Sequence, residues 1–217
     1  MNKLISREEA MKHIQDGTTL MINGFMGCRN PDGLIDAMVE KGVRDLTLIA
    51  NDTAIPGKGI GKLVTNRQIR HLIASHIGLN PETGVLINAG EMEVTLVPQG
   101  TLAERIRCAG AGIGGFLTPT GLGTEVEAGK QTMTIDGKTY LLELPLKADV
   151  AILFGSVVDT HGNVYYKGTA KNFSLVMAMA ADVVIVEAEK LVEAGELDPD
   201  LVMTPGLFVD YIVKGDA

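Results

Sequence analysis

Two uncharged amide side chains follow predicted strands, at points where ligand sites are common. Asn51 comes directly after the apolar run of residues 43–50, and Gln99 follows the short strand predicted at residues 94–97. Open α/β sheets bind their ligands at the carboxyl ends of parallel strands. Neutral amides stabilise a developing oxyanion, or orient a carboxylate, without permanently neutralising it. The pair therefore indicates acyl or carboxylate chemistry, although Asn51 and Asp52 also suit an ordinary turn.

A glycine-spaced loop is the second candidate part of such a site. A short apolar run in residues 16–23 leads to glycines at positions 24 and 27, and Pro31 then opens a segment with helical spacing. Where side chains are missing, backbone N–H groups and the N-terminus of the following helix can face an anionic or polarised group. The same pattern is typical of ordinary βα turns, so the loop alone leaves both interpretations open.

The reactive group of an acyl-transfer site is not evident in this chain. The sequence has no G-x-S-x-G motif, and Cys28 and Cys108 have no histidine close in sequence. Most glutamates are expected on exposed helix faces, including Glu8, Glu9, Glu187, Glu189, Glu193 and Glu196. Either the protein is not an enzyme by itself, or another chain supplies the group that reacts.

Composition argues against several classes of function. A formal net charge of −8 and an aromatic content of 4% do not favour nucleic-acid binding. No apolar run approaches the roughly 20 residues of a membrane span, and the amino terminus is too charged for a secretory signal. The two cysteines have no disulfide or metal spacing, so we expect a reduced, cytoplasmic protein. His71 and His76 fall on opposite faces of a predicted strand, and no metal site is expected.

The predicted elements form a single α/β domain over residues 1–217. Nearly continuous apolar runs at residues 43–50, 148–156 and 182–187 are typical of strands buried on both faces in a parallel sheet. No linker, charge block or internal repeat divides the chain.

One segment changes to a period of two. Residues 132–135 and 138–142 alternate in polarity around Asp136 and Gly137, which predicts an antiparallel hairpin. Residues 110–115 match G-x-G-x-x-G. They follow a predicted helix and not a strand, so we reject a dinucleotide-binding fold.

Two helix starts are predicted from capping residues. Ser6 and Glu9 form a capping box before a short helix with Ala10, Met11 and Ile14. Asn172 is expected to cap a later helix that contains Leu175, Val176, Met179 and Ala180.

Taken together, the chain resembles the α subunit of two-subunit short-chain CoA-transferases of the acetate or butyrate:acetoacetate type. Each matching segment is weak alone, but their joint order over nearly the whole length is specific. The segments are residues 16–25 with Pro31, 46–53, 98–102, 112–121, 142–149 and 203–206.

The resemblance implies a fold and a reaction. The fold is a mostly parallel sheet of about seven strands with an antiparallel hairpin excursion, shared with sugar-phosphate isomerases. The reaction moves CoA between a short-chain acyl-CoA (acetoacetyl-CoA, acetyl-CoA or butyryl-CoA) and a short-chain carboxylate. In the family this ping-pong reaction passes through a glutamyl-CoA thioester on a β-subunit glutamate within a Ser-Glu-Asn-Gly motif. This chain lacks that motif.

The resemblance also implies roles for particular residues. Asn51 and Gln99 would project amides toward the partner glutamate, with no catalytic residue on this chain. A loop would line the acyl-CoA site, namely Asn23, Gly24, Phe25, Met26, Gly27, Cys28, Arg29 and Asn30. Asn23 and Arg29 depart from the family's usual glycines, and Arg29 either contacts a CoA phosphate or lies on the surface.

The expected assembly is an α2β2 or larger heteromer that uses coenzyme A as substrate carrier, with no permanently bound cofactor and no metal. Two other functions stay open at this point. One is a non-catalytic ligand-binding or sensor domain on the same fold. The other is a sugar-phosphate isomerase, which needs an acid/base carboxylate pair that the sequence does not convincingly offer.

Overall fold

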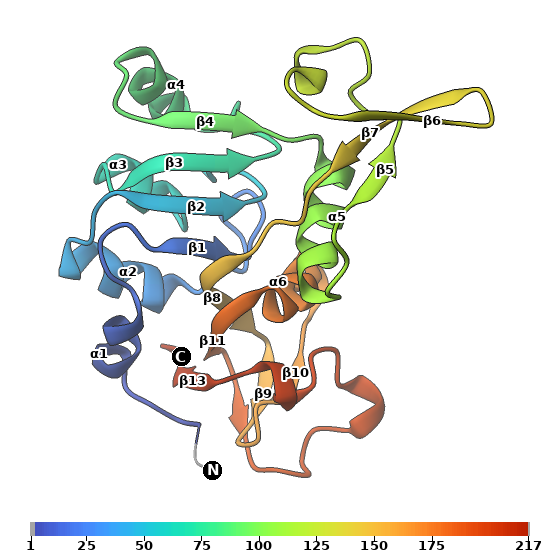
Figure 1. Cartoon of the computed structure of the whole chain (residues 1–217). Coiled ribbons are helices and arrows are strands. Elements are labelled where there is room, and N and C mark those ends of the chain that lie inside the picture. Colours follow the sequence, from blue (N-terminus) through green and yellow to red (C-terminus); the bar gives the residue numbers. More distant parts are fainter. Residues whose placement is uncertain (1–2, 217) are drawn as a thin grey trace.

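A seven-stranded sheet, parallel throughout, forms the centre of the computed structural model, which describes residues 3–216 (Figure 1). Each neighbouring pair of strands is parallel, so all carboxyl ends lie at one edge. In spatial order the strands are β13 (Tyr211–Lys214), β11 (Ala181–Ala188), β8 (Ala148–Gly155), β1 (Thr19–Ile22), β2 (Leu46–Ala50), β3 (Ile69–Ala74) and β4 (Glu93–Leu96). The predicted sheet is confirmed. That residues 1–217 form a single domain stays a prediction. Residues 1, 2 and 217 lie outside the described residues.

Alternating strand side chains fill two cores, one on each face of the sheet. In β1, Leu20 and Ile22 belong to one core and Met21 to the other. The first core is covered by α1 (Arg7–Ala10), α2 (Asp32–Lys41), α3 (Gly61–Thr65) and α4 (Pro81–Asn88). The second is covered by α5 (Gln99–Gly110) and α6 (Ser174–Met179). Short 3₁₀ helices complete the chain at Met11–His13, Glu125–Glu127, Gly168–Lys171, Pro199–Leu201 and Gly206–Phe208.

The two helix caps predicted from sequence have different outcomes. The Ser6 hydroxyl accepts from the Glu9 N–H at 3.1 Å and the Glu9 carboxylate accepts from the Ser6 N–H at 2.9 Å, which confirms the capping box. The predicted Asn172 cap is wrong. Helix α6 follows Phe173, whose φ is 56°, and has no side-chain cap, because the Asn172 side chain bonds to Asn51 instead.

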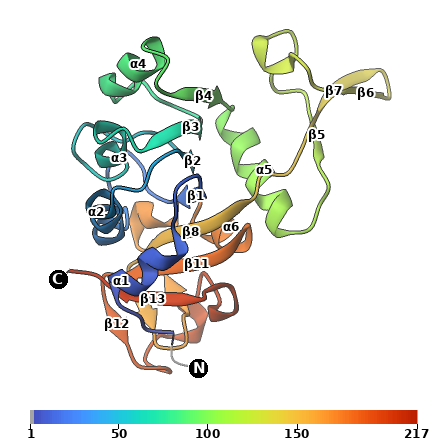
Figure 2. The same ribbon diagram turned by 60° about the vertical axis from the view of Figure 1, so that its left-hand side comes forward.

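An antiparallel sheet projects from the body beyond α5 (Figure 2). The predicted hairpin is confirmed as β6 (Thr132–Ile135) and β7 (Lys138–Glu143), joined at Asp136 and Gly137 with φ values of 49° and 76°. Strand β5 (Phe116–Thr118) pairs on the other side of β7. Residues 110–115 end α5 and lead into β5, as predicted. A third small sheet contains β10 (Val164–Tyr165), β9 (Val157–Asp159) and β12 (Leu191–Val192).

Within residues 3–216, the helices lack the combination of length and apolar character that a bilayer crossing requires.

A buried carboxylate joins the sheet to the N-terminus of α2. Glu187 on β11 is 6% exposed, and its carboxylate accepts from the N–H groups of Gly33 at 3.1 Å and Leu34 at 2.7 Å. The expectation of an exposed helix position is wrong for Glu187, because β8 and β13 flank its strand. The N-terminus of α2, for which the sequence left open both a ligand anion and an ordinary βα turn, therefore holds the protein's own carboxylate.

The Glu187 carboxyl gives a testable pH dependence. Burial raises its pKa from 4.5, while its hydrogen bonds to Gly33 and Leu34 and the charge of Arg7 oppose the shift and Asp32 adds to it. The folded state then binds this proton more tightly than the unfolded chain, so Glu187 makes stability fall as pH rises from 4.5 through its folded-state pKa. Denaturant unfolding should show this decline in the wild type and a smaller decline in Glu187→Gln.

The matched control is Glu93→Gln, which removes a carboxylate from an exposed position on the edge strand β4. Its pH profile should parallel that of the wild type. Parallel profiles for Glu187→Gln and the wild type would contradict the role assigned to burial.

Candidate functional site

Three amide side chains form one chain of hydrogen bonds at the carboxyl edge of the sheet. Gln99 Nε2 donates to Asn51 Oδ1 at 2.6 Å, and Asn51 Nδ2 donates to Asn172 Oδ1. Asn51 Nδ2 also donates to the Gly24 carbonyl at 3.4 Å. The structure thus brings the two predicted amides into direct contact. It adds Asn172, which sequence reasoning missed because it lies 121 residues from Asn51 and resembled a helix cap.

The members of this amide chain differ in exposure. Asn51 is 2% exposed, whereas Gln99 is exposed in the first turn of α5 and Asn172 is half-buried before α6. Gln99 and Asn172 line a cavity of about 420 Å³, a volume within the range of small-molecule sites. The other lining residues come from α5, α6 and the turn before it: Gly100, Ala103, Lys171, Phe173, Leu175 and Val176.

The predicted binding loop makes a tight turn beside Asn51. The N–H groups and carbonyls of Phe25 and Cys28 bond to each other at 2.9 and 3.3 Å, and Met26 and Gly27 have φ values of 55° and 75°. This turn leaves the side chains of Phe25, Met26 and Cys28 exposed. The carboxylate of Asp52, directly after Asn51, accepts from the Met26 N–H at 3.0 Å. The loop and the end of β2 are therefore one connected unit.

Two asparagines of the predicted loop are buried. Asn23 is 1% exposed, accepts from the Phe154 N–H at 2.8 Å and donates to Ser174 Oγ at 2.8 Å. Asn30 is 3% exposed, and a Cβ added to Gly24 would lie 2.0 Å from its Oδ1. The Asn23 side chain thus joins the backbone of β8 to Ser174, whereas the buried Asn30 Nδ2 has no hydrogen-bond partner within residues 3–216. Contact between either asparagine and CoA stays a prediction.

Arg29 links the loop to β8 and to the residue that directly follows β11. Its φ is 58°, its Nη1 pairs with Glu189 Oε1 at 2.7 Å, and its guanidinium lies 5.5 Å from the centre of the Phe154 ring. The ion pair and the ring contact hold the guanidinium in place. Because the side chain is 34% exposed, the cation also reaches the surface. A contact with a CoA phosphate stays a prediction.

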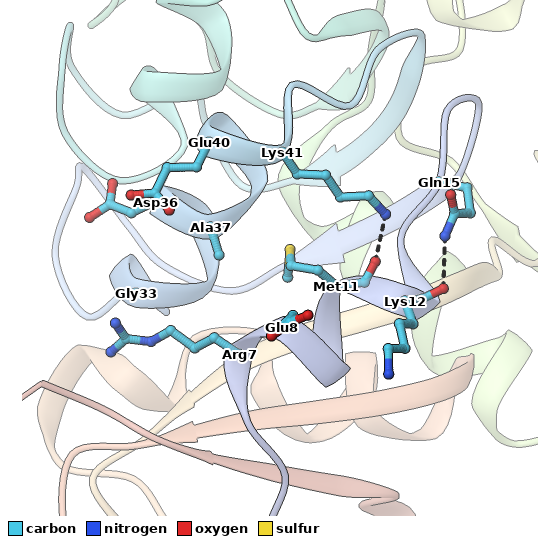
Figure 3. Close-up of a pocket in the computed structure, with 10 residues that line it drawn as sticks. All are labelled: Arg7, Glu8, Met11, Lys12, Gln15, Gly33, Asp36, Ala37, Glu40 and Lys41. Atoms are coloured by element: carbon cyan, nitrogen blue, oxygen red, sulfur yellow. Dashed lines mark hydrogen bonds between the residues drawn. The ribbon is translucent and has the colours of Figure 1, made fainter.

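A second cavity, of about 580 Å³, lies between α1 and α2 on the opposite face of the sheet (Figure 3). Two of its charged groups, Lys41 and Asp36, already have partners within the chain. Lys41 Nζ donates to the carbonyls of Met11 and Ile14 at 2.7 and 2.6 Å, and Asp36 pairs with Lys62 at 2.5 Å. We therefore place the site at the carboxyl edge, despite the larger volume here. The part of the chain that the structure describes holds no cluster of three metal-ligating side chains.

Comparison with known proteins places the chain in one family. A sequence profile described as "Coenzyme A transferase" matches residues 5–215. The chain is 56% identical over 211 residues to the acetate CoA-transferase subunit alpha of Escherichia coli, a match that covers 97% of this chain and 96% of that protein. It is 54% identical over 216 residues to the acetoacetyl-CoA:acetate/butyrate CoA transferase alpha subunit of Clostridium acetobutylicum, covering 100% and 99% of the two chains.

The fold is shared with a solved structure. An acyl-CoA transferase of Escherichia coli superposes with a TM-score of 0.84 at 24% identity. The match covers 99% of this chain and 47% of that one, so this chain spans about half of that protein's length.

The close approach of Gly24 and Asn30 predicts a large effect of one methyl group. Gly24→Ala puts a side chain at a φ of 136° and 2.0 Å from Asn30 Oδ1, so the free energy of unfolding should fall by about 3 kcal/mol. The control Gly57→Ala has a φ of 71° and no atom within 4 Å of the added Cβ, so it should lose only about 1 kcal/mol. Equal losses, measured by chemical denaturation, would show that the Asn30 contact is unimportant.

Proposed function

The chain belongs to the coenzyme A transferase family, and we propose that it is the α subunit of an enzyme that moves CoA between a short-chain acyl-CoA and a short-chain carboxylate. The names of its relatives support acetoacetyl-CoA as an acyl donor, and acetate and butyrate as carboxylates. The observation that carries this proposal is the Gln99–Asn51 hydrogen bond of 2.6 Å beside an open cavity. Such fixed neutral amides suit acyl transfer between carboxylates and thioesters.

The two buried glutamates among residues 3–216 are committed to other contacts. Glu143 is 1% exposed and pairs with Lys130 at 2.5 Å, and Glu187 holds the N-terminus of α2. Neither residue lines the cavity beside Gln99. This supports a division of labour in which a β subunit supplies the nucleophilic glutamate.

The proposed reaction proceeds by ping-pong covalent catalysis. The partner's glutamate attacks the acyl-CoA carbonyl carbon and expels CoA thiolate, which leaves a mixed anhydride. The thiolate then attacks the glutamyl carbonyl and releases the first carboxylate, giving glutamyl-CoA. The incoming carboxylate reverses these steps. It attacks the glutamyl-CoA carbonyl and expels CoA thiolate, which leaves a new anhydride. The thiolate then attacks the acyl carbonyl, forms the new acyl-CoA and frees the glutamate. No net proton is transferred.

In this scheme the present chain stabilises charge and holds the substrate. Each attack places negative charge on a carbonyl oxygen, and amide N–H groups beside the cavity stabilise it. The loop of residues 23–30 lines the acyl-CoA site, and coenzyme A is the carrier, with no permanently bound cofactor. We further propose an α2β2 or larger heteromer in the cytoplasm, where the free Cys28 and Cys108 would stay reduced.

Location of the covalent intermediate tests the division of labour. The purified chain should be mixed with acetoacetyl-CoA, alone and with a candidate β subunit, and analysed by mass spectrometry. We expect a CoA adduct on the β subunit and none on this chain. An adduct on this chain would contradict the scheme, and absence of transfer with β subunits of the family would favour a non-catalytic sensor.

Removal of either predicted amide should slow the chemical step. In the assembled enzyme, Gln99→Ala and Asn51→Ala should each lower kcat about 100-fold, or about 3 kcal/mol of barrier, because oxyanion stabilisation is weakened. Gel filtration should show intact complexes. The control Gln15→Ala truncates an exposed amide that donates to the Lys12 carbonyl at 2.8 Å, away from the cavity, and it should keep wild-type kcat. Unchanged kinetics in both site variants would remove these residues from the site.

A further inference from the structure

We propose that Gln99 and Asn172 are the two amide donors that face the reacting carbonyl, and that Asn51 is the buried positioning residue between them. The inference rests on the proposed transferase function and changes the assignment of donors that the family resemblance implies. Its basis is the direction of the three hydrogen bonds in the amide chain.

Asn51 has no N–H group left for a substrate. A primary amide carries two N–H donors and one carbonyl acceptor. The Asn51 donors go to Asn172 Oδ1 and to the Gly24 carbonyl, and its Oδ1 accepts from Gln99. With 2% exposure and its hydrogen bonds in use, Asn51 orients its neighbours and does not itself reach the cavity.

The direction of the amide chain leaves donors free at both of its ends. Gln99 donates one of its two N–H groups to Asn51, whereas Asn172 uses only its carbonyl oxygen, which accepts from Asn51. Among residues 3–216, no further hydrogen bond engages the remaining N–H of Gln99 or the Nδ2 group of Asn172. Both residues line the cavity of about 420 Å³. Two neutral donors thus come to one cavity from different elements, α5 and the turn before α6.

The turn that carries Asn172 is fixed from the sheet below. Phe173, the next residue, has a φ of 56°, an uncommon conformation for a bulky side chain that requires support from its surroundings. Ser174 Oγ accepts from Asn23 Nδ2 at 2.8 Å and donates to the Ala170 carbonyl at 2.5 Å. The buried Asn23 therefore holds the turn that carries Asn172.

Two substitutions at Asn172 test whether its side chain donates a hydrogen bond to the oxyanion or only orients Asn51. Asn172→Asp keeps an oxygen that can accept from Asn51 and removes the N–H donors, while Asn172→Ala removes both and adds no charge. If Asn172 donates to the oxyanion, both variants should lower kcat of the α–β enzyme by about 100-fold or more, with little change in KM. If Asn172 only orients Asn51, Asn172→Asp should keep kcat within about threefold of the wild type, and the proposal is overturned.

The control Asn88→Asp makes the same chemical change at an exposed position on α4 and should keep wild-type kcat. Thermal unfolding and assembly with the β subunit should be normal in all variants that enter the comparison. An inactive wild-type heteromer overturns the proposed function and this inference with it. An active wild type together with an active Asn172→Asp variant overturns this inference alone.

Discussion

The site depends on the need of one buried amide to be fully hydrogen-bonded. Asn51 is 2% exposed, and an unpaired buried polar group costs about 1–3 kcal/mol. Its partners lie on three different segments: Gly24 after β1, Gln99 at the start of α5, and Asn172 before α6. Satisfying this single side chain therefore brings the loop and both cavity walls to fixed positions. Parallel strands make this possible, because their carboxyl ends all face the same edge.

Much of the fold could be predicted from the sequence because its signals are local. Nearly continuous apolar runs mark β2, β8 and β11, since these strands are buried on both faces. The Asp136-Gly137 pair specifies its turn through backbone conformations that those residue types tolerate. Local apolar patterns also predicted that Asn51 and Gln99 follow the ends of strands. Their mutual hydrogen bond follows from the sheet order, which a local pattern does not contain.

Three polar residues have environments that the sequence did not predict, and the cause is the same for each. The partner of the polar group lies far away along the chain. Glu187 was expected in solvent because a glutamate usually is, and only the packing of α2 against β11 supplies its two N–H donors. Asparagine is a common helix-capping residue, but the Asn172 side chain accepts a hydrogen bond from the distant Asn51 and does not cap α6. Asn23 looked like extra bulk in a glycine-rich loop, whereas it occupies a buried space between Phe154 and Ser174.

Charged and neutral groups have separate tasks around the loop. Carboxylates hold the frame: Glu187 binds the N-terminus of α2, Glu189 pairs with Arg29, and Asp52 accepts from the Met26 N–H. The amides of the cavity wall carry no net charge. A fixed cation there would favour carboxylate ground states and resist their conversion to neutral thioesters, whereas an amide stabilises the oxyanion as it forms and releases either product. A transfer that must run through similar steps in both directions therefore favours neutral donors beside the reacting carbonyl, while the one cation that lines the cavity, Lys171, is exposed to solvent.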